Sequence, residues 1–423
     1  MRVDVVGGGL AGIAAALELA DGGAEVALHE ARPRLGGATF SIERDGVWMD
    51  NGQHVFLRCC TAYVELLERL GVRGQVHLQR RLEIPVLEPG GRSSWLTRNG
   101  LPAPLHLAGS LARYRFLSPG ERLSAVRAAL ALRRLDLADP ALDERTFGEW
   151  LVEHGQSASV QERFWDLIVL PTVNLRSADA SLALATKVFQ TGLLEDAAAA
   201  DIGWSAVPLG RLHGEAAERA LAAAGVEVRL RAPVASLAEL DADAVVVAVP
   251  HREAAELVPG AAGAAALGSA PIVNLHVVYD RRVTDLPLAA GVGTPVQYVF
   301  DRTGSHGIAE GQYLAVSLSG AFEYDRKKVD ELRALFVPEL ARLFPAAAKA
   351  SVERFFVTRE PYATFRQGPG TAALRRVTAP DGVFVAGAWT DTGWPATMEG
   401  AVRSGVAAAR AALGAPAREE VAA

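Results

Sequence analysis

The sequence contains very little cysteine and has no excess of positive charge, and both features narrow what the protein can be. Its only 2 cysteines among 423 residues, Cys59 and Cys60, are adjacent, and a structural disulfide across so short a loop would be strained. No Cys/His spacing predicts zinc or another metal centre. The formal net charge of −6 gives no basic field to attract nucleic acid. These absences favour a metal-free protein of a reducing, cytoplasmic compartment with no nucleic-acid partner.

Long apolar runs are also missing. The longest uncharged segment, residues 257–279, is broken by Pro259, Pro271 and several glycines and lacks the sustained hydrophobicity of a spanning helix. The N-terminal segment starts like a secretion signal, but Asp4 and three consecutive glycines interrupt its apolar part. We therefore expect a soluble protein or one bound at the cytoplasmic face of a membrane. Its length predicts at least two domains.

The strongest motif occupies the first 30 residues. Residues 3–6 predict a buried strand, residues 10–20 a helix and residues 25–29 a second strand. Between the first strand and the helix, the glycine spacing GxGxxG lets a pyrophosphate approach the helix N-terminus. An acid follows 18 residues after the last glycine, where a carboxylate binds ribose hydroxyls and disfavours the 2′-phosphate of NADP. The predicted nucleotide-binding residues are Gly7, Gly8, Gly9, Leu10, Ala11, Gly12 and Glu30.

Other glycine-containing segments of the chain are also typical of a nucleotide-binding site. The segment 34–37, Arg-Leu-Gly-Gly, follows the acid and leads into a predicted hairpin over residues 40–49. Near the C-terminal end, a strand runs into Gly387, and the sequence Met-Glu-Gly-Ala at 398–401 opens a helix. A helix N-terminus stabilises the negative charge that reduction places on a flavin. A Val-rich strand at 243–250 would return to the central sheet.

Together these motifs resemble the amine oxidase and carotenoid desaturase superfamily of FAD-dependent enzymes. The resemblance implies an α/β, glutathione-reductase-type (Rossmann-like) FAD-binding domain with an inserted α+β substrate domain. It also implies that a backbone amide near Val234 contacts adenine. The superfamily usually has an acid after the glycine at 387, contacting the ribityl chain; here Ala388 stands there, and Asp391 is the candidate to replace it. The further cofactor-binding residues implied are Arg34, Gly36, Gly37, Gly52, Gln53, Val234, Gly387, Asp391, Met398 and Glu399.

The same resemblance divides the chain. We predict a discontinuous FAD-binding domain, a substrate domain made of a helical cap plus a mixed β-sheet, and a flexible tail. In the helical part, Thr146-x-x-Glu149 and Ser159-x-x-Glu162 are predicted capping boxes. The sheet part holds predicted strands at 272–279, 296–300, 313–318 and 352–358 and a helix at 327–343. The predicted boundaries are 1–75, 205–260 and 378–415 for the FAD domain, 76–204 and 261–377 for the substrate domain, and 416–423 for the tail.

Two segments carry a narrower resemblance. The sequence Gly-Gln-His-Val-Phe at 52–56 and the segment 101–107 resemble the hydroxysqualene dehydroxylase family, and this likeness covers nearly the whole chain. It implies reductive removal of an allylic hydroxyl from a linear C30 isoprenoid, giving squalene for hopanoid synthesis. That chemistry needs a general acid for the departing oxygen, a dry pocket, and hydride from N5 of reduced flavin. His54 is the candidate acid, with Asp50 to orient it; alternatively, His54 only hydrogen-bonds backbone or flavin.

Three other functions stay open. A phytoene or carotenoid-type desaturase shares the FAD motifs and the substrate shape, and the direction of electron flow cannot be read from sequence. Flavin amine oxidases usually carry an aromatic residue before the C-terminal helix, where this chain has Thr397, so an amine substrate is disfavoured. A prenyl-binding module of the Rab GDP-dissociation-inhibitor type would not need the intact GxGxxG. An electron-donating reductase or direct reduction by NAD(P)H would supply electrons.

A basic segment predicts contact with a membrane surface. Residues 101–135 contain six arginines and one glutamate. On a helix from 121 to 135, Leu123, Val126 and Leu130 form one stripe, and snorkelling arginines suit an anionic bilayer. Alternatively, the helix packs its Ala125, Ala128 and Leu132 face inward and its arginines are merely solvated. The arginines that border the stripe are Arg122, Arg127, Arg133 and Arg134.

Overall fold

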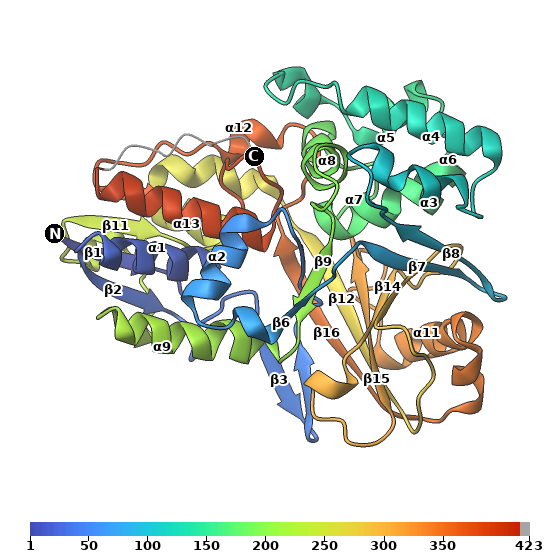
Figure 1. Cartoon of the computed structure of the whole chain (residues 1–423). Helices are drawn as coiled ribbons and strands as arrows, with labels where there is room; N and C mark the ends of the chain where they lie inside the picture. The colour runs from blue at the N-terminus through green and yellow to red at the C-terminus, as the bar shows by residue number, and fades with distance from the viewer. Residues whose placement is uncertain (415–423) are drawn as a thin grey trace.

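Two large β-sheets lie side by side, and a group of helices lies above the second sheet in the view of Figure 1. The computed structural model describes residues 1–414, so the predicted tail at 416–423 lies outside the described residues. Within that described range, no helix has both the length and the apolar character needed to cross a membrane.

The first sheet is entirely parallel, with the strand order β10-β2-β1-β11-β17. Its strands come from the three segments predicted for the FAD domain, although the domain boundaries stay a prediction. The predicted Rossmann-like α/β class is confirmed, and the Val-rich β1 and β11 are central strands buried on both faces. The strands are β1 (Arg2–Val6), β2 (Glu25–Glu30), β10 (Glu227–Leu230), β11 (Ala244–Val247) and β17 (Val383–Val385).

Helices cover both faces of this sheet. One face packs against α1 (Leu10–Asp21), α9 (Ala216–Ala223) and α13 (Met398–Ala412), and the other against α10 (His251–Leu257). Helices α1 and α13 approach very closely, because a Cβ on Gly405 would lie 2.0 Å from the carbonyl oxygen of Ala11. The C-terminal helix is thereby held against the helix that follows the GxGxxG loop.

The second sheet has seven strands in the order β16-β12-β15-β14-β13-β7-β8. Both segments predicted for the substrate domain contribute to it: the first insertion, residues 76–204, and the second insertion, residues 261–377. The four strands predicted between 272 and 358 are confirmed, as is the predicted helix, now α11 (Val329–Leu343), which packs on the sheet. Of the strands in this sheet, sequence reasoning missed three, β7, β8 and β13, and the first two lie in the insertion that was predicted to be mainly helical. The strands are β7 (Glu83–Glu88), β8 (Arg92–Thr97), β12 (Ala270–Tyr279), β13 (Leu288–Gly291), β14 (Tyr298–Asp301), β15 (Gln312–Ser319) and β16 (Val352–Thr364).

Most of the remaining part of the first insertion is helical. The capping box at Thr146 and Glu149 is confirmed at the start of α5. The capping box predicted at Ser159 is wrong, because the helix begins earlier and Ser157 caps it, accepting a hydrogen bond from the Val160 amide. The helices are α3 (Ala108–Ala112), α4 (Pro119–Leu132), α5 (Phe147–Glu153), α6 (Ala158–Val160), α7 (Asp166–Val173) and α8 (Leu182–Phe189); α12 (Thr371–Arg375) follows β16.

Two small sheets connect the large ones. The predicted hairpin is formed by β3 (Ser41–Arg44) and β4 (Val47–Asp50), and β5 (Val55–Leu57) pairs with β9 (Ile202–Ser205), which also pairs with β6 (Val76–Leu78). Helix α2 (Thr61–Arg69) follows β5. The loop 51–54 between β4 and β5 joins the two halves: the Asn51 side chain donates to the Ala38 carbonyl, and Asn274 on β12 donates to the Asn51 carbonyl.

Candidate functional site

The GxGxxG loop adopts the conformation that its glycines predict. Gly7 has a φ of +108°, and a Cβ on Gly12 would lie 1.8 Å from the Gly7 carbonyl oxygen, so both positions require glycine. Helix α1 then starts at Leu10 after Gly9, without a capping side chain and without an acid in its first turn. Its first amides therefore face the loop without a side-chain acceptor, as a pyrophosphate site requires.

Glu30 lies at the end of β2, directly beside this loop. Its buried carboxylate accepts hydrogen bonds from the Gly8 amide at 2.7 Å and from the Arg32 amide at 2.7 Å. The two amides fix the carboxylate at the carboxyl end of the parallel sheet, where the ribose of a dinucleotide is expected.

The Arg-Leu-Gly-Gly segment packs on the GxGxxG loop. The Gly36 amide donates to the Gly8 carbonyl at 2.9 Å, and a Cβ on Gly37 would lie 2.7 Å from the Gly9 Cα. The Arg34 guanidinium donates to the Gly37 carbonyl and stacks over the Phe40 ring. The GxGxxG loop and the segment 34–37, which we call the flavin loop, thus form one continuous surface.

Segments from the middle and the end of the chain complete this edge of the sheet. The Ala248 carbonyl after β11 lies beside Gly7, and Gly387 after β17 has a φ of +145° and donates its amide to Ser404 on α13. Val234 follows β10, and no atom of the described residues accepts a hydrogen bond from its backbone amide. That amide suits the adenine contact expected of it, which stays a prediction.

The start of α13 makes contacts that the sequence did not predict. Thr397 caps the helix, its hydroxyl accepting from the Gly400 amide, and Met398 packs against the core beneath α1. The fully buried Glu399 carboxylate accepts from the Ala62 amide at 3.2 Å and the Tyr63 amide at 2.8 Å at the start of α2, and pairs with Arg403. Its side chain therefore joins α13 to α2, and a cofactor contact of Glu399 stays a prediction.

Asp391, the predicted ribityl contact, already pairs with other residues of the chain. Its carboxylate forms an ion pair with Arg376 at 3.0 Å, and its amide donates to the Arg375 carbonyl. To contact a ribityl chain it would have to exchange or share that partner, and its replacement of the acid missing at Ala388 stays a prediction.

These residues fit FAD. The uncapped start of α1, the acid on β2 and the glycine surface suit the phosphates and a ribose, and the carboxyl end of an open parallel sheet is where such ligands bind. The amide nitrogen of Gln53, in the loop 51–54, is buried without an acceptor among residues 1–414, so this loop also offers an unused donor.

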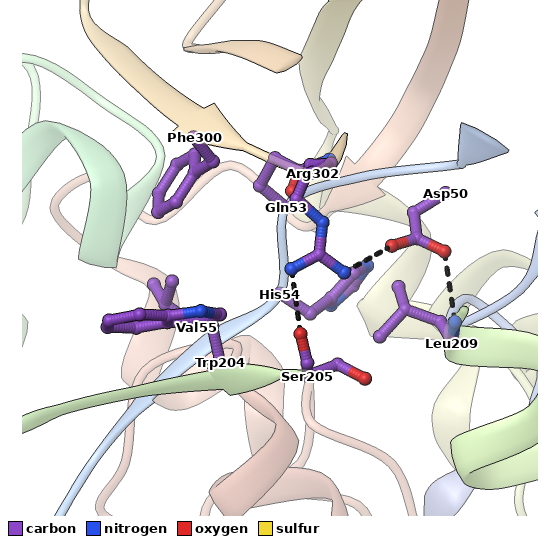
Figure 2. A pocket seen from close by; sticks show the side chains of 9 residues that line it. All are labelled: Asp50, Gln53, His54, Val55, Trp204, Ser205, Leu209, Phe300 and Arg302. Atoms are coloured by element: carbon purple, nitrogen blue, oxygen red, sulfur yellow. Dashed lines mark hydrogen bonds and ion pairs between the residues drawn. The ribbon is translucent and has the colours of Figure 1, made fainter. Parts of the chain in front are cut away.

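His54 lines a small cavity of about 10 Å³ behind this loop (Figure 2). No hydrogen bond joins its ring to any described residue, and a Cβ on Gly52 would lie 3.2 Å from its Nε2. Burial lowers its pKa below 6.5, and the nearby Asp50 charge only partly opposes this. The cavity is lined by Asp50, Gln53, His54, Val55, Trp204, Ser205, Leu209, Phe300 and Arg302.

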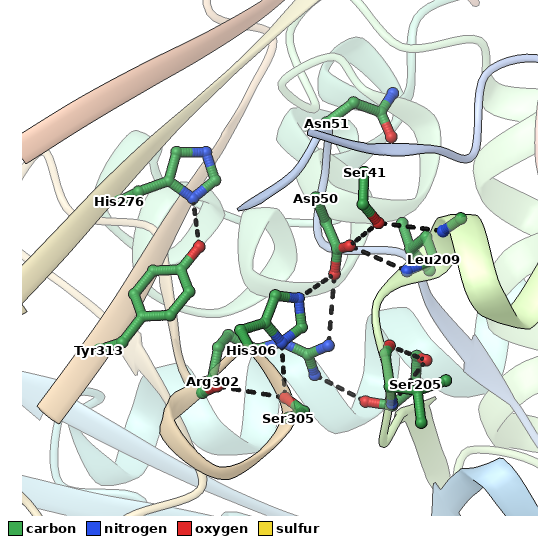
Figure 3. Close-up of polar contacts among 12 residues, drawn as sticks. Ser41, Asp50, Asn51, Ser205, Leu209, His276, Arg302, Ser305, His306 and Tyr313 are labelled. Carbon is green, nitrogen blue, oxygen red and sulfur yellow. Dashed lines mark hydrogen bonds and ion pairs between the residues drawn. The ribbon is translucent and has the colours of Figure 1, made fainter. Parts of the chain in front are cut away.

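Asp50 lies at the centre of a buried polar network instead of orienting His54 (Figure 3). One carboxylate oxygen accepts from the Ser41 hydroxyl at 2.6 Å and the Leu209 amide at 2.9 Å. The other accepts from His306 at 2.8 Å and from Arg302 at 3.3 Å. Asp50 has no direct hydrogen bond to His54, so the predicted orienting contact is not formed.

The network keeps Asp50 ionised. Burial alone would raise its pKa, but the hydrogen bond from His306 and the positive charge of Arg302 outweigh burial and lower the pKa to about 2. Arg302, whose side chain is 4% exposed, is the matching buried cation, and it also donates to the Ser205 carbonyl at 2.7 Å. No sequence pattern indicated Arg302 or His306, because neither belongs to a motif and both lie more than 250 residues from Asp50.

A buried histidine, His213, lies near His54 and near the glycine loops. His213 lies on a π-helical turn, Gly210–Glu215, and its Nε2 lies 2.8 Å from the Tyr63 hydroxyl on α2. Burial, with a smaller contribution from His54, lowers its pKa to about 3, so it is neutral. On the same turn, a Cβ on Gly214 would lie 3.1 Å from the Leu35 carbonyl oxygen, within the predicted flavin loop. The His54 cavity therefore lies close to where the flavin is expected.

Comparison with known proteins agrees with this site. Residues 10–413 match the family of flavin-containing amine oxidoreductases. Hydroxysqualene dehydroxylase of Rhodopseudomonas palustris is 30% identical, with 98% of each chain covered, and zeta-carotene desaturase of Synechocystis is 24% identical over 100% of this chain and 99% of its own. Cyclohexylamine oxidase of Brevibacterium oxydans, 21% identical and covering 98% of both chains, shares the fold with a TM-score of 0.74. The chain therefore belongs to the flavin-containing amine oxidoreductase family and is an FAD-dependent oxidoreductase related to hydroxysqualene dehydroxylase.

Proposed function

We propose that this enzyme reductively removes the allylic hydroxyl of hydroxysqualene and releases squalene for hopanoid synthesis. The observation that carries the proposal is the match to hydroxysqualene dehydroxylase over 98% of both chains. The site agrees with it, because an unpaired histidine meets apolar walls, Val55 and Phe300, at one cavity beside the cofactor loops. A linear C30 isoprenoid requires apolar walls, and its hydroxyl requires a proton donor.

In this proposal the residues of the loop 51–54 act on the leaving oxygen. His54 protonates the oxygen as the carbon–oxygen bond breaks, since hydroxide is a poor leaving group. The charge of Asp50 favours the imidazolium form of His54 through space, as it opposes the effect of burial on the His54 pKa. Reduced FAD, when bound, supplies a hydride to the carbon. The GxGxxG loop and Glu30 hold the cofactor, and the apolar walls exclude water from the allylic cation.

Product analysis under anaerobic conditions tests the proposal. Photoreduced holoenzyme incubated with hydroxysqualene should form squalene in one equivalent per flavin. Conversion of phytoene or zeta-carotene by oxidised holoenzyme, with no squalene formed in the first assay, would instead favour the desaturase. Either NAD(P)H or an added reductase should then sustain turnover, and this identifies the electron donor.

The two remaining candidates are weaker. Thr397 caps α13 and supplies no aromatic wall, which disfavours an amine oxidase. A prenyl-binding module without FAD would be colourless after purification and would stay colourless with added FAD, whereas we expect a yellow protein with flavin absorbance.

We also propose that α4 contacts an anionic membrane surface, from which a water-insoluble substrate would enter. Ala125, Ala128 and Leu132 are buried, so the helix packs as its periodicity predicts, while Leu123 and Leu130 are exposed. Charged residues beside exposed apolar side chains suit the headgroup region. Arg122 differs from the other predicted arginines, because its guanidinium donates to the backbone carbonyls of Ala112 and Leu117 and is not free to face a membrane. The exposed arginines are Arg127, Arg133 and Arg134.

Liposome co-sedimentation tests this contact. Replacing Arg127, Arg133 and Arg134 by alanine should release the protein from vesicles containing anionic lipid, and salt should weaken wild-type binding. The matched control replaces three exposed arginines far from α4, Arg219, Arg326 and Arg333, and should bind as the wild type does. Binding that neither salt nor the first variant changes would contradict the proposal.

A further inference from the structure

The cavity beside His54 has room for about one oxygen atom. Its volume is about 10 Å³, and a site of this size holds one water-sized group when polar partners surround it. Trp204, Val55 and Phe300 supply apolar walls (Figure 2). Such a cavity has no room for an amine head group or a phosphate.

Two buried donors at this cavity have no acceptor. Arg302 uses its two terminal nitrogens on Ser205 and Asp50, but its Nε finds no acceptor among the residues that the structure describes. The amide nitrogen of Gln53 is buried and unpaired in the same way. Buried N–H groups are nearly always paired in folded proteins, so two orphans at one cavity indicate a ligand that accepts hydrogen bonds.

We propose that Arg302 and Gln53 bind the hydroxyl oxygen of the substrate and hold it as it leaves. The inference rests on the proposed dehydroxylation. In that reaction the carbon–oxygen bond breaks, its electron pair leaves with the oxygen, and a proton from His54 completes a water molecule. The carbon receives a hydride from the reduced cofactor, so that R–OH, one proton and one hydride give R–H and water.

Arg302 suits this role better than His54 alone does. Because burial keeps His54 largely neutral near pH 7, few molecules carry the imidazolium at any moment. Burial lowers the pKa of Arg302, but the Asp50 charge opposes this and the guanidinium starts from a pKa of 12.5, so it stays charged near pH 7. Preorganised donors stabilise charge that develops on a leaving oxygen. Asp50 balances the Arg302 charge without occupying its Nε.

The same residues mark a path for the released water. An open cleft of about 520 Å³ adjoins the small cavity and shares Trp204, Ser205 and Arg302 with it. Arg302 therefore lines both spaces, and water released at the small cavity has a short route past Arg302 to solvent.

The test compares binding of alcohol and hydrocarbon. Oxidised holoenzyme, which does not turn over, is titrated with hydroxysqualene and with squalene in detergent, following the flavin spectrum. The wild type should bind the alcohol about tenfold or more tightly, because a site built for a hydroxyl rejects the analogue that lacks it. Gln53→Met, which keeps the side-chain length and removes the donors, should lower this preference about tenfold and reduce kcat in the photoreduced assay. Arg302→Lys, which keeps the charge for Asp50, should do the same.

The controls separate the alternatives. Gln161→Met, at a half-buried glutamine in the helical part of the chain that does not line the cavity, should keep the wild-type preference and rate. If Arg302→Lys fails to fold, Gln53→Met still decides, since the Gln53 side chain makes no hydrogen bond among residues 1–414. A wild-type enzyme that makes squalene while both variants keep the full preference would overturn this inference alone. Loss of FAD from Gln53→Met would assign the amide to the cofactor and also overturn it. No squalene from the wild type would overturn the proposed function as well.

Discussion

Replacing Asp50 by asparagine should destabilise the folded chain strongly at neutral pH. The substitution preserves shape but removes the negative charge that pairs with the buried Arg302 and accepts from His306. Lowering the Asp50 pKa from 3.8 to about 2 corresponds to roughly 2 kcal/mol of folding free energy above pH 4. Leaving a buried cation unpaired typically costs about 3–5 kcal/mol. We therefore expect Asp50→Asn to lower the free energy of unfolding by about 3 kcal/mol.

The pH dependence of the free energy of unfolding distinguishes this ion-paired carboxylate from a buried carboxyl group without a partner. Because the folded pKa is lowered, the contribution of Asp50 is complete above the unfolded pKa of 3.8 and is lost only as pH falls towards 2. The difference between wild type and Asp50→Asn should thus stay constant from pH 7 to pH 5 and shrink below pH 4. A carboxyl whose pKa were raised by burial would instead show the difference growing as pH falls through that raised pKa.

Urea unfolding followed by far-UV circular dichroism measures both quantities. The midpoint should fall for Asp50→Asn with an unchanged slope, and the control Asp241→Asn, at a fully exposed carboxylate, should stay within about 0.5 kcal/mol of the wild type. A loss below 0.5 kcal/mol for Asp50→Asn, or a difference that depends on pH above 5, would refute the reasoning.

Three further substitutions probe other parts of the site. Gly37→Ala, whose Cβ would lie 2.7 Å from the Gly9 Cα, should reduce FAD content after purification at least tenfold, while Gly23→Ala, with a similarly positive φ but open space, should keep its FAD. Glu399→Gln, which removes the charge that binds the start of α2, should lower the free energy of unfolding by about 1–3 kcal/mol in the same urea assay. His54→Gln should lower kcat about 100-fold or more; in the wild type, kcat/KM should fall as pH rises through a pKa below 6.5, because the acid must be protonated, and that limb should vanish in the variant.

The cofactor half of the site could be predicted because its chemistry is local in sequence. Backbone amides, tight turns and one acid bind a dinucleotide, and their spacing from Gly7 to Gly37 survives in the linear sequence. The inward-facing side of α4 could be predicted from its helical periodicity for the same reason, and the burial of Ala125 and Ala128 confirms this prediction. Each of these predictions needs only residues that are neighbours along the chain.

The substrate half could not be predicted, because its partners are distant in sequence. Asp50 meets Arg302 and His306 only after β14 and β15 pair in the second sheet, and no spacing records that pairing. Strands β7 and β8 were missed because Pro85 and a run of polar residues weaken the strand signal, whereas parallel pairing of β7 with β13 and antiparallel pairing of β7 with β8 stabilise it in the sheet. Tertiary contacts thus decide the elements that local propensity leaves open.

The polarity of the small cavity bears on the choice between dehydroxylation and desaturation. A desaturase substrate is a hydrocarbon, which offers no acceptor to the Arg302 Nε or to the Gln53 amide. Each buried donor left unpaired costs about 1–3 kcal/mol, and a hydrocarbon substrate would not recover this cost. A substrate hydroxyl would accept hydrogen bonds from both donors, so the enzyme would bind the alcohol more tightly than the hydrocarbon. The water formed in the reaction would accept the same hydrogen bonds until it leaves past Arg302. The two unpaired donors therefore support an enzyme whose substrate carries a hydroxyl, with electrons passing from flavin to substrate.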